Sequence, residues 1–513
     1  MRVKNFLIQN KEILILLLIY VVLYSFNLDK FPIVTGDENW FINPAYDLVM
    51  FGKMGTSMIY GFYNIANFTY WQPPVFILLL AAFFKLFGFG IVQARMVSVF
   101  LGFLTVLFTY LLGLKLYNKK IGLLAALLML LNPLFFVISR TVRMDIAVAC
   151  FMVIAIYCTF LALKESKLGY YFASALFATL ALLSHPNGII AILSVVIIIL
   201  FEKIDFKSIN RLKFNISFNE IFVFIAGVII PLIPYILYIS LDFEAFKGQF
   251  MVNIVASPSN PLTNIILEPT RYIELFWGLA NYGGFVLTGV VFAITIILTI
   301  LGLYYITHKL NFNDKFLLIV LVVSLGVLSV LVYHKYFIYL GLLLPYLFIL
   351  IALTLKDNVR LQFNKKGAMS VFIIVLWVIL IVGNCILINN FLEENKDYDY
   401  YSNEHEIEKY IPAGSVVMGN HNYWIALHDK YTYYGYEIRF GEGFHQYKTK
   451  INDMLINLKP EYILFDESVW SSEEDKSMED FVNQNCTLIA VVPANDIKEH
   501  RIIKIYQINK PFS

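Results

Sequence analysis

Residues 143–163 read RMDIAVACFMVIAIYCTFLAL, an arginine and an aspartate followed by an apolar run that carries no charge. A bilayer core about 30 Å thick asks for about 20 apolar residues in a helix, so this run is close to the required length. The whole chain has the same character: its 513 residues are 59% hydrophobic and 15% charged, with a mean hydropathy of +0.70. Soluble domains average roughly 45–50% apolar and about 25% charged residues. We therefore predict a polytopic α-helical membrane protein and exclude a water-soluble globular one.

Eleven segments are apolar enough to be expected as transmembrane helices. They cover residues 10–27, 92–114, 121–138, 145–163, 169–184, 187–202, 220–241, 282–306, 316–333, 336–355 and 368–390. The first resembles the core of a signal peptide, but no cleavage pattern follows it, so we expect a retained anchor. The fifth and sixth are divided only by the polar step from Ser184 to Gly188. The sequence thus predicts about 11 transmembrane helices.

Lysine and arginine concentrate in one set of connections between these helices. This set holds Arg2, Lys4, Lys11, Lys115, Lys119, Lys120, Lys164, Lys167, Lys203, Lys207, Arg211, Lys213, Lys309, Lys315, Lys356, Arg360, Lys365 and Lys366. Cytoplasmic loops carry such an excess, so we expect this side, with the N-terminus, to face the cytoplasm of a cell with the protein in its plasma membrane. The opposite, outer side has the two longest loops, 28–91 and 242–281, and with an odd helix count it also receives everything after residue 391.

Two domains are expected. Residues 1–391 form the transmembrane domain, and residues 392–513 are rich in charge and read as an extracytoplasmic soluble α/β domain. Short β-type runs at 414–418, 462–465 and 488–492 alternate there with helical stretches. No glycine-rich phosphate fingerprint opens a helix in this tail.

Charge and cysteine content exclude several functions. The chain has 39 basic and 37 acidic residues, a net charge of +2, so the basic footprint of a nucleic-acid binder is missing. The four cysteines, Cys150, Cys158, Cys385 and Cys486, form no C-x-x-C pair and suggest no disulfide framework. Any partner must therefore be recognised by individual sites.

Acids and arginines mark the outer ends of the expected helices. Asp37 and Glu38 follow the first helix by about ten residues, close enough to the interface to reach a lipid headgroup. Arg143 and Asp145 stand at the outer start of the fourth helix; a guanidinium fork suits phosphate oxygens, and a carboxylate can orient it or act on a hydroxyl. Ionisable groups at membrane depth are functional candidates by default. A solvated loop acid and a structural Arg–Asp pair are the alternatives.

The first outer loop also contains an apolar stretch after two prolines. Trp71 and Gln72 precede Pro73 and Pro74, which end one element before an apolar one begins. We expect interfacial helices in this loop, one of them lying in the membrane plane with Trp71 and Lys85 at its hydrated ends. Simple membrane anchoring would explain the same pattern.

Further polar residues lie on the same outer side. His185 follows the fifth helix, and His334 and Lys335 stand beside Tyr336 and Tyr339. A lone histidine is more often packed than catalytic, so these are secondary candidates. If the charge-derived topology holds, acids that activate an acceptor and cations that hold a leaving phosphate share one cavity.

Taken in order, these motifs resemble a family. They comprise Asp37-Glu38, the Pro73-Pro74 step, the run from Phe84 to Gly88, Ala94-Arg95, Arg143-x-Asp145, and Lys335, Tyr339 and Pro345. Over roughly residues 30–355 the chain resembles the lipid-dependent membrane glycosyltransferases. These include the protein O-mannosyltransferases and the aminoarabinose transferases that modify lipid A, and they share the multi-spanning C-type glycosyltransferase fold.

The resemblance implies roles for some residues. Asp37 matches the acid at the catalytic centre of the family, as base or acceptor orienter, with Glu38 beside it. Arg143 and Asp145 match the second polar site. Gln72 stands where many aminoarabinose transferases have lysine, and the turn at His185 replaces a lysine-containing turn. Both departures argue against lipid A as the substrate.

The expected function is transfer of a sugar from a polyprenyl-phosphate-linked donor to a lipid, glycan or protein acceptor on the extracytoplasmic face, with inversion. Nucleotide sugars are made in the cytoplasm, so an outer site needs a membrane carrier. We assign catalytic roles to Asp37, Glu38 and Asp145, donor-phosphate binding to Arg143, His334 and Lys335, and cavity lining to Trp71, Gln72, His185 and Tyr339. No cofactor or metal is required, although Asp37, Glu38 and Asp145 could recruit a divalent cation.

Two other classes of function explain the sequence less well. A transporter or flippase of lipid-linked saccharides would also line a cavity with polar groups, but such folds often show paired halves with broken helices, and we detect no internal symmetry. A sensor whose tail binds a ligand would not explain why acids and arginines punctuate several separate loops.

Overall fold

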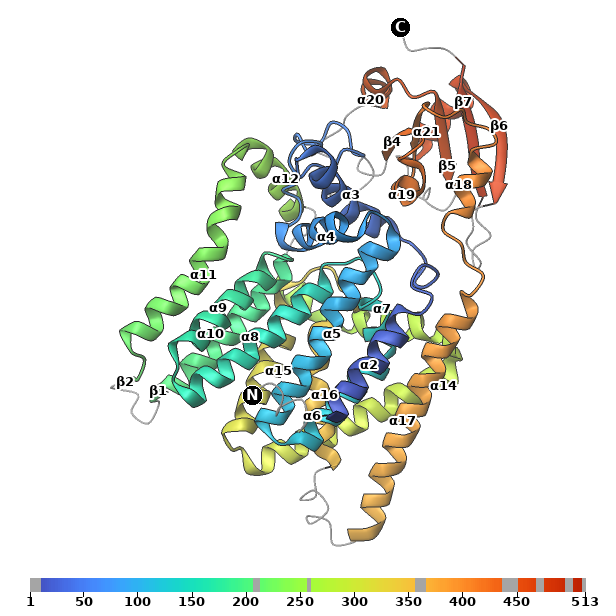
Figure 1. The fold of residues 1–513 in the computed structure, drawn as a ribbon. Coiled ribbons are helices and arrows are strands. Elements are labelled where there is room, and N and C mark those ends of the chain that lie inside the picture. Colours follow the sequence, from blue (N-terminus) through green and yellow to red (C-terminus); the bar gives the residue numbers. More distant parts are fainter. Residues whose placement is uncertain are drawn as a thin grey trace.

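The computed structural model describes residues 11–205, 213–255, 260–355, 366–435, 451–466, 475–493 and 502–509. A bundle of helices makes up most of the molecule, and a smaller domain with a β-sheet lies at one end of it (Figure 1). The bundle and its end layer contain α2 (Lys11–Ser25), α3 (Gly36–Phe51), α4 (Pro74–Phe87), α5 (Ile91–Leu116), α6 (Lys119–Leu131), α7 (Pro133–Ile138), α8 (Asp145–Glu165), α9 (Leu168–Leu182), η1 (Pro186–Gly188), α10 (Ile189–Lys203), β1 (Ile204–Asp205), β2 (Lys213–Phe214), α11 (Phe218–Ile239), α12 (Phe243–Val255), α13 (Pro261–Ile266), α14 (Glu268–Lys309), α15 (Phe312–Leu331), η2 (Phe337–Leu342), α16 (Leu344–Ala352), η3 (Leu353–Leu355) and α17 (Lys366–Glu394).

Seven helical segments in the described parts of the chain are long and apolar enough to cross a membrane. They are Ile91–Leu116, Asp145–Glu165, Pro186–Lys203, Phe218–Ile239, Pro261–Thr307, Phe312–Leu331 and Met369–Glu394. Each matches one of the expected spans. The count of about 11 is not confirmed, because the other four expected spans fold as shorter helices.

Local sequence features, which mean hydropathy does not register, explain why some of these helices are short. The expected span 121–138 is divided into α6 and α7 because Asn132 caps a new helix, its side chain accepting a hydrogen bond from the Phe135 amide. Pro133 then occupies the first turn, where its missing N–H costs nothing. The expected span 336–355 begins with the 3₁₀ helix η2 and reaches only nine residues of α-helix in α16.

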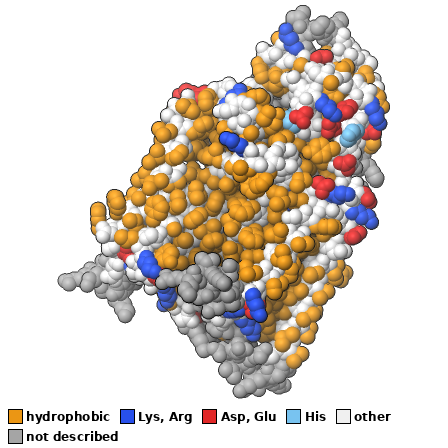
Figure 2. Space-filling model, in the orientation of Figure 1, with side chains coloured by type: hydrophobic (Ala, Val, Ile, Leu, Met, Phe, Trp, Pro, Cys, Tyr) orange, Lys and Arg blue, Asp and Glu red, His pale blue; other side chains and the backbone are white. Residues whose placement is uncertain are grey.

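The surface of the bundle is apolar. Exposed hydrophobic side chains include Phe218 and Phe222 of α11 and Val371 and Val378 of α17. Figure 2 shows hydrophobic side chains over the middle of the bundle, with charged side chains gathered over the sheet domain and at the opposite end. In water such a belt would be unfavourable, whereas the hydrocarbon of a bilayer covers it at no cost.

Helices α3 and α4 lie across the end of the bundle that faces the sheet domain (Figure 1). Helix α4 begins at Pro74, directly after Pro73, and ends before Gly88, as the sequence predicts. Its buried face includes Phe76, Leu80 and Phe84. The first outer loop therefore forms a helical layer that covers this end of the bundle.

The C-terminal domain contains one mixed sheet with strand order β4-β3-β5-β7-β6. Strand β3 pairs in parallel with β4 and β5, while β7 pairs antiparallel with β5 and β6. The elements are α18 (Ser402–Ile407), β3 (Val416–Gly419), η5 (His421–Tyr423), α19 (Trp424–Leu427), β4 (Thr432–Gly435), α20 (Ile451–Leu458), β5 (Tyr462–Asp466), α21 (Asp475–Asn485), β6 (Cys486–Pro493) and β7 (Ile502–Ile508). The three expected β runs correspond to β3, β5 and β6, whereas β4 and β7 were not expected.

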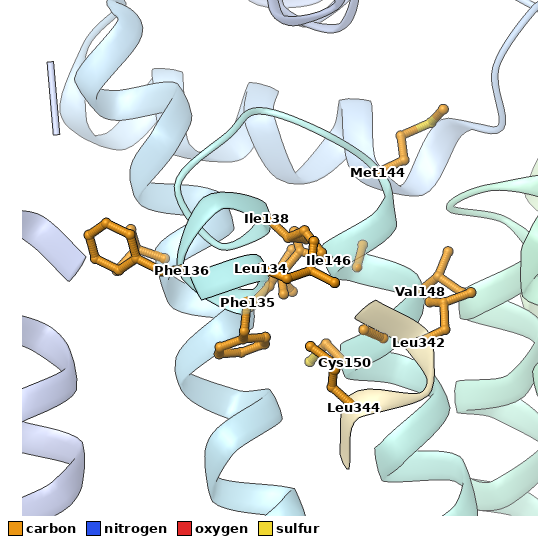
Figure 3. Close-up of a cluster of buried hydrophobic side chains, with 14 of the residues drawn as sticks. Leu134, Phe135, Phe136, Ile138, Met144, Ile146, Val148, Cys150, Leu342 and Leu344 are labelled. Atoms are coloured by element: carbon orange, nitrogen blue, oxygen red, sulfur yellow. The ribbon is translucent and has the colours of Figure 1, made fainter. Parts of the chain in front are cut away.

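An apolar cluster fixes the start of α8 against its neighbours. Leu134 and Phe135 of α7 lie close to Ile146 of α8, and Leu342 and Leu344 approach from the junction of η2 with α16 (Figure 3). All five side chains are almost fully buried. Because packed interiors tolerate little displacement, this cluster holds the segments that carry the polar residues described next.

Candidate active site

One guanidinium joins two carboxylates at the end of the bundle beneath α3. Arg143 Nη1 donates to Asp37 Oδ2, and Arg143 Nε donates to Asp145 Oδ2 at 3.0 Å. The Asp37 side chain is 58% exposed, whereas those of Arg143 and Asp145 are 14% and 5% exposed. The structure therefore brings together three predicted site residues, with Asp37 on the accessible side.

Both acids stand in the first turn of a helix. Asp37 is the second residue of α3 and Asp145 the first residue of α8, where the helix dipole favours negative charge. Burial opposes the charged form of Arg143, but the charges of Asp145 and Asp37 outweigh it and raise the pKa of the guanidinium above its usual value. Arg143 is accordingly a fixed positive charge.

Glu38 points away from this group into a second ion pair. Its two oxygens accept hydrogen bonds from Arg95 Nε at 2.9 Å and Nη2 at 2.7 Å, and neither side chain has any exposed surface. Glu38 also accepts a hydrogen bond from the Val142 amide at 2.9 Å. This pair ties α3 to α5 and to the turn before α8. The placement favours a structural role for Glu38 over the catalytic one expected beside Asp37.

Arg140 is a further buried arginine with a structural position. Its guanidinium donates to backbone carbonyls at the end of α2 and in the turn that follows. The acceptors are Leu23, Tyr24, Phe26, Asn27 and Phe31. Carbonyls at a helix C-terminus have no intrahelical partner, so a cation is well placed there.

A second group of charges surrounds Lys335. Lys335 Nζ lies 2.9 Å from Glu268 Oε2 and donates to the Ser329 carbonyl at 3.0 Å. Arg271 Nε donates to Glu268 Oε1 at 3.1 Å, and its Nη1 donates to the Tyr336 carbonyl at 2.8 Å. Two cations thus share one carboxylate. Among the described residues this group has one positive charge in excess, which suits an anion such as a phosphate.

Tyr339 lies between the two groups. The Arg271 guanidinium is 5.6 Å from the Tyr339 ring centroid, and the charges of Asp37, Arg143 and Asp145 all act on the phenol. Tyr339 is 7% exposed, so its hydroxyl is held among these charges. The predicted residues Asp37, Arg143, Asp145, Lys335 and Tyr339 consequently belong to one region.

The two predicted histidines border this region. The His185 ring centroid is 5.7 Å from that of Tyr339, and His185 Nδ1 accepts a hydrogen bond from the Asn187 amide. Burial lowers the pKa of His185, so the ring is neutral at pH 7 and its proton resides on Nε2. His334 is exposed and stacks on Tyr336 with ring centroids 5.7 Å apart. His185 therefore offers a neutral ring, and not a positive charge, to a phosphate.

Trp71 and Gln72 lie farther along the first outer loop. The Trp71 ring packs edge to face with Trp40 at 6.5 Å, and the Trp71 amide donates to Gln249 Oε1 at 2.8 Å. Gln72 is 4% exposed, and its Oε1 is buried without a hydrogen-bond partner among the described residues. Trp71 therefore contacts Trp40, which stands one turn after Asp37 in α3.

The carboxylates are not arranged as a metal site. In the described parts of the chain, no group of three or more His, Cys, Asp and Glu residues could hold a metal ion. Arg143 lies between Asp37 and Asp145, and Glu38 is committed to Arg95. A divalent cation would have to displace a guanidinium. As arranged here, these three acids do not fit one.

Comparison with known proteins identifies the fold. Residues 71–235 match the profile of the family described as dolichyl-phosphate-mannose-protein mannosyltransferase. ArnT from Cupriavidus metallidurans in the apo state superposes with a TM-score of 0.64 at 14% identity, over 96% of this chain and 97% of ArnT. Bound to undecaprenyl phosphate, ArnT superposes with a TM-score of 0.60 at 13% identity and the same coverage. The chain has the C-type glycosyltransferase fold. The resemblance expected from the sequence is confirmed at this level.

Two further proteins resemble this chain, one by its structure and one by its sequence. The archaeal oligosaccharyltransferase AglB from Archaeoglobus fulgidus, in complex with an inhibitory peptide and a dolichol-phosphate, has a TM-score of 0.54 at 14% identity. The superposition covers 89% of this chain and 69% of AglB. An uncharacterized protein of Aquifex aeolicus (strain VF5) is 21% identical over 280 residues. That match spans 52% of this chain and 54% of the relative, about half the length of each.

Two residues of the site were not expected from the sequence. Glu268 and Arg271 begin α14, within the long outer loop expected at 242–281. The Glu-Pro-Thr-Arg run at 268–271 was a visible signal, since it places two charges beside a proline in an outer loop. Lys335, which pairs with Glu268, lies far along the chain from this run, and no pattern in the sequence predicts the pairing.

Proposed function

We propose that this protein is a glycosyltransferase that transfers a sugar from a polyprenyl-phosphate-linked donor to an acceptor hydroxyl. The proposal rests on Arg143, which bridges an exposed Asp37 and a buried Asp145. An accessible carboxylate can take a proton from a substrate, and a guanidinium beside it can stabilise a phosphate that leaves.

Proton transfer and leaving-group stabilisation are coupled in this arrangement. The acceptor oxygen attacks the anomeric carbon and loses its proton to Asp37, while the bond from that carbon to the phosphate oxygen breaks. The bonding electrons leave with the polyprenyl phosphate, and a single displacement inverts the anomeric configuration. Protonation removes the charge of Asp37, so Arg143 Nη1 loses an anionic partner as a new phosphate charge develops. Asp145 keeps Arg143 in place through Nε.

The cations around Lys335 supply the rest of the donor site. Arg271 and Lys335 both pair with Glu268, the one acid that contacts either of them in the described part of the chain. Their fixed positions favour a phosphate at the Tyr339 side of the site, because preorganised donors need no rearrangement during the reaction. In this proposal Lys335 has the donor-phosphate role expected from the sequence, and Arg271 joins it.

We infer that the site faces away from the cytoplasm, with the N-terminus inside and the C-terminal domain outside. The excess of lysine and arginine in the connections at the opposite end of the bundle supports this orientation. Sugars activated as nucleotides stay in the cytoplasm, so a carrier lipid would bring the sugar to the outer face. Undecaprenyl phosphate bound to ArnT and dolichol-phosphate bound to AglB are carriers of this chemical class.

A transporter or flippase of lipid-linked saccharides is the alternative. Transport asks for polar groups near the middle of the bilayer. In the described apolar helices, every Asp, Glu, Lys and Arg lies within about two turns of a helix end. This distribution favours chemistry at one face over passage between faces.

The test uses proteoliposomes with a panel of undecaprenyl-phosphate-linked monosaccharides. We expect the protein to release undecaprenyl phosphate from at least one of them, and Asp37→Asn to lower the rate about 100-fold or more, the contribution of a general base. Asp429→Asn, which changes an exposed acid of the C-terminal domain, is the matched control and should keep the rate. An unchanged rate in Asp37→Asn would remove the catalytic assignment. Movement of the donors between leaflets without release would establish transport instead.

A further inference from the structure

Three aromatic rings from separate parts of the chain meet beside Asp37. The Trp40 ring of α3 lies 6.5 Å from Trp71 of the first outer loop and 6.1 Å from His421 of η5, both in edge-to-face geometry. All three side chains are partly exposed. We call Trp40, Trp71 and His421 the aromatic cluster.

The aromatic cluster is on the same face of α3 as the proposed base. Trp40 follows Asp37 by three residues, and residues three apart on a helix are neighbours on its surface. Phe62, which is almost fully buried, packs edge to face against Trp71 at 5.9 Å and supports that ring from behind. A molecule that contacts Trp40 is therefore within reach of the Asp37 carboxylate.

A close approach of backbone and side chain places His421. A Cβ atom at Gly36 would lie 2.0 Å from His421 Nε2 and 2.6 Å from Asn422 Oδ1. Only glycine leaves room for this contact, and Gly36 directly precedes Asp37. The C-terminal domain thus presents an imidazole to the first turn of α3.

Hydrogen bonds hold the two parts in this position. The Asn39 side chain donates to the Asn422 carbonyl at 3.1 Å and accepts a hydrogen bond from the Ile425 amide at 2.9 Å. The Tyr400 hydroxyl donates to the same Asn422 carbonyl at 2.7 Å. Asn39 is fully buried, so breaking these bonds would leave polar groups without partners inside the protein. His421 is accordingly a fixed part of the site.

We propose that the aromatic cluster is the binding site for a saccharide acceptor, and that the C-terminal domain completes it through His421. This inference rests on the proposed function, because it places the acceptor hydroxyl beside Asp37. One face of a pyranose ring carries several C–H groups, which pack on the electron-rich face of an aromatic ring. Indole and imidazole nitrogens can donate hydrogen bonds to the hydroxyls at the ring edge.

The composition of the aromatic cluster favours a saccharide over a peptide. Its three members carry no fixed charge and make no strand edge to which a peptide backbone could add. A site for a lipid chain would be lined by aliphatic side chains. Indoles and an imidazole instead combine apolar faces with polar edges. The cluster therefore selects the headgroup sugar of a glycolipid or a glycan end as the acceptor.

Binding is measured on the full chain in lipid nanodiscs by saturation-transfer difference NMR. The probes are the methyl glycosides of glucose, galactose, mannose and N-acetylglucosamine, with a serine- and threonine-containing peptide for comparison. We expect at least one glycoside to bind and the peptide not to bind. Trp40→Ala should weaken that binding about tenfold or more, while Trp277→Ala, which removes an exposed tryptophan of α14, should leave it unchanged.

A pair of variants tests the contribution of His421. Gly36→Ala should displace the imidazole and weaken glycoside binding, and His421→Ala should weaken it as much. In the double variant the added methyl no longer meets the ring, so we expect no further loss beyond His421→Ala alone, a non-additivity that marks direct contact. Trp40→Phe keeps an aromatic ring and provides a folded control if Trp40→Ala does not insert.

The outcomes separate this inference from the proposed function. Glycoside binding that survives both Trp40→Ala and His421→Ala, or peptide binding that Trp40→Ala abolishes, would overturn the saccharide site. Loss of binding in those variants together with full donor turnover in Asp37→Asn would leave the saccharide site standing and remove the catalytic assignment. We expect Asp37→Asn to bind the glycoside and fail to transfer to it.

Discussion

Arg143 shares one guanidinium between two carboxylates of unequal exposure, and this asymmetry assigns their roles. Asp145 is buried and held through Nε, so it orients the arginine. Asp37 is mostly exposed and contacts Nη1, so it can exchange its partner for a substrate. A lysine at this position would offer one point charge without the planar fork.

The variants Arg143→Ala and Arg143→Lys test this division. Arg143→Ala leaves the buried Asp145 without its cation, so we expect lower thermal stability and a raised KM for the donor. Arg143→Lys restores a charge that can pair with one acid at a time, so stability should recover more than turnover does. Melting temperature, kcat and donor KM of both variants check this. Full turnover in Arg143→Lys would show that the bridge between the two acids has no part in the reaction.

Glu38 and Asp37 are adjacent in sequence, and the structure predicts opposite effects for their amides. Glu38→Gln breaks a fully buried ion pair and leaves Arg95 without its anionic partner, which costs about 3–5 kcal/mol of stability. Asp37→Asn should change stability little because that side chain is exposed, while it removes turnover. Thermal unfolding in detergent and donor release give the two readouts. A stable, inactive Glu38→Gln protein would restore Glu38 to the catalytic centre.

At the scale of the element, side chains of α3 accept hydrogen bonds from the loop that follows the helix. Asp47 near its end accepts hydrogen bonds from the Ser57 amide and the Ser57 hydroxyl, both at 3.0 Å. Asn43 accepts a hydrogen bond from the Met58 amide at 3.2 Å. These contacts close the loop after α3 and fix the helix that carries Asp37 and Trp40.

Asp47 makes this loop sensitive to pH. Burial raises the pKa of Asp47 to about 6, although hydrogen bonds from Ser57 oppose the rise. An unfolded aspartate titrates near pH 4, so between about pH 4 and pH 6 the folded protein holds a proton that the unfolded chain has released. Stability from this group therefore falls as the pH rises through that window and stays constant above it. Asp47→Asn should remove this component.

The measurement compares melting temperatures of Asp47→Asn and the parent protein from pH 4 to pH 8. We expect the melting temperature of the variant to rise relative to that of the parent between pH 4 and pH 6. Above pH 6 the difference between the two melting temperatures should stay constant. Any constant offset reports the altered hydrogen bonds to Ser57. Parallel curves over the whole range would show that Asp47 does not titrate there.

The elements also show how far sequence patterns reach. Segments such as 145–163 are predicted within a few residues because long apolar runs have one stable solution in a bilayer. The break at Asn132-Pro133 is readable as a cap and a first-turn proline, yet hydropathy alone passes over it. Helix α14 extends from Glu268 through a backbone irregularity at Gly284, where φ is 70°, and the expected span started only at 282. Local polar chemistry, more than apolar content, sets these boundaries.

The sequence predicted which types of residue form the site, but it predicted only some of their contacts. Asp37, Arg143 and Asp145 are close in space. The topology derived from the basic residues already placed them on one side of the membrane, without any knowledge of packing. The role of Glu38 was not predictable, because nothing in its sequence position distinguishes a sealed partner of Arg95 from an open acid. The position of His421 could not be predicted, because its close approach to Gly36 joins two segments that are far apart in the sequence.

At the scale of the whole molecule, the bundle has two chemically different ends. Helix α5 starts next to the site, where Arg95 pairs with Glu38, and its 26 residues carry the chain about 39 Å to the opposite end. There Lys119 begins α6 and pairs with Glu12 at 2.7 Å. The length of α5 matches the hydrocarbon thickness and part of each interface. A membrane around the belt in Figure 2 therefore separates Asp37 from Lys119.

Cysteine labelling in sealed cells tests which end faces outward. In a background with the four native cysteines replaced, Asp37→Cys and Asp397→Cys should react with a membrane-impermeant maleimide, because both positions are exposed on the side of the C-terminal domain. Lys119→Cys, whose parent side chain is 37% exposed, should react only after the membrane is opened. The reverse pattern would put the site in the cytoplasm, where nucleotide sugars are available and a carrier lipid would no longer be required. Reaction of positions 37 and 119 from the same side would contradict the span assigned to α5, and with it the separation of basic loops from the site on which the orientation depends.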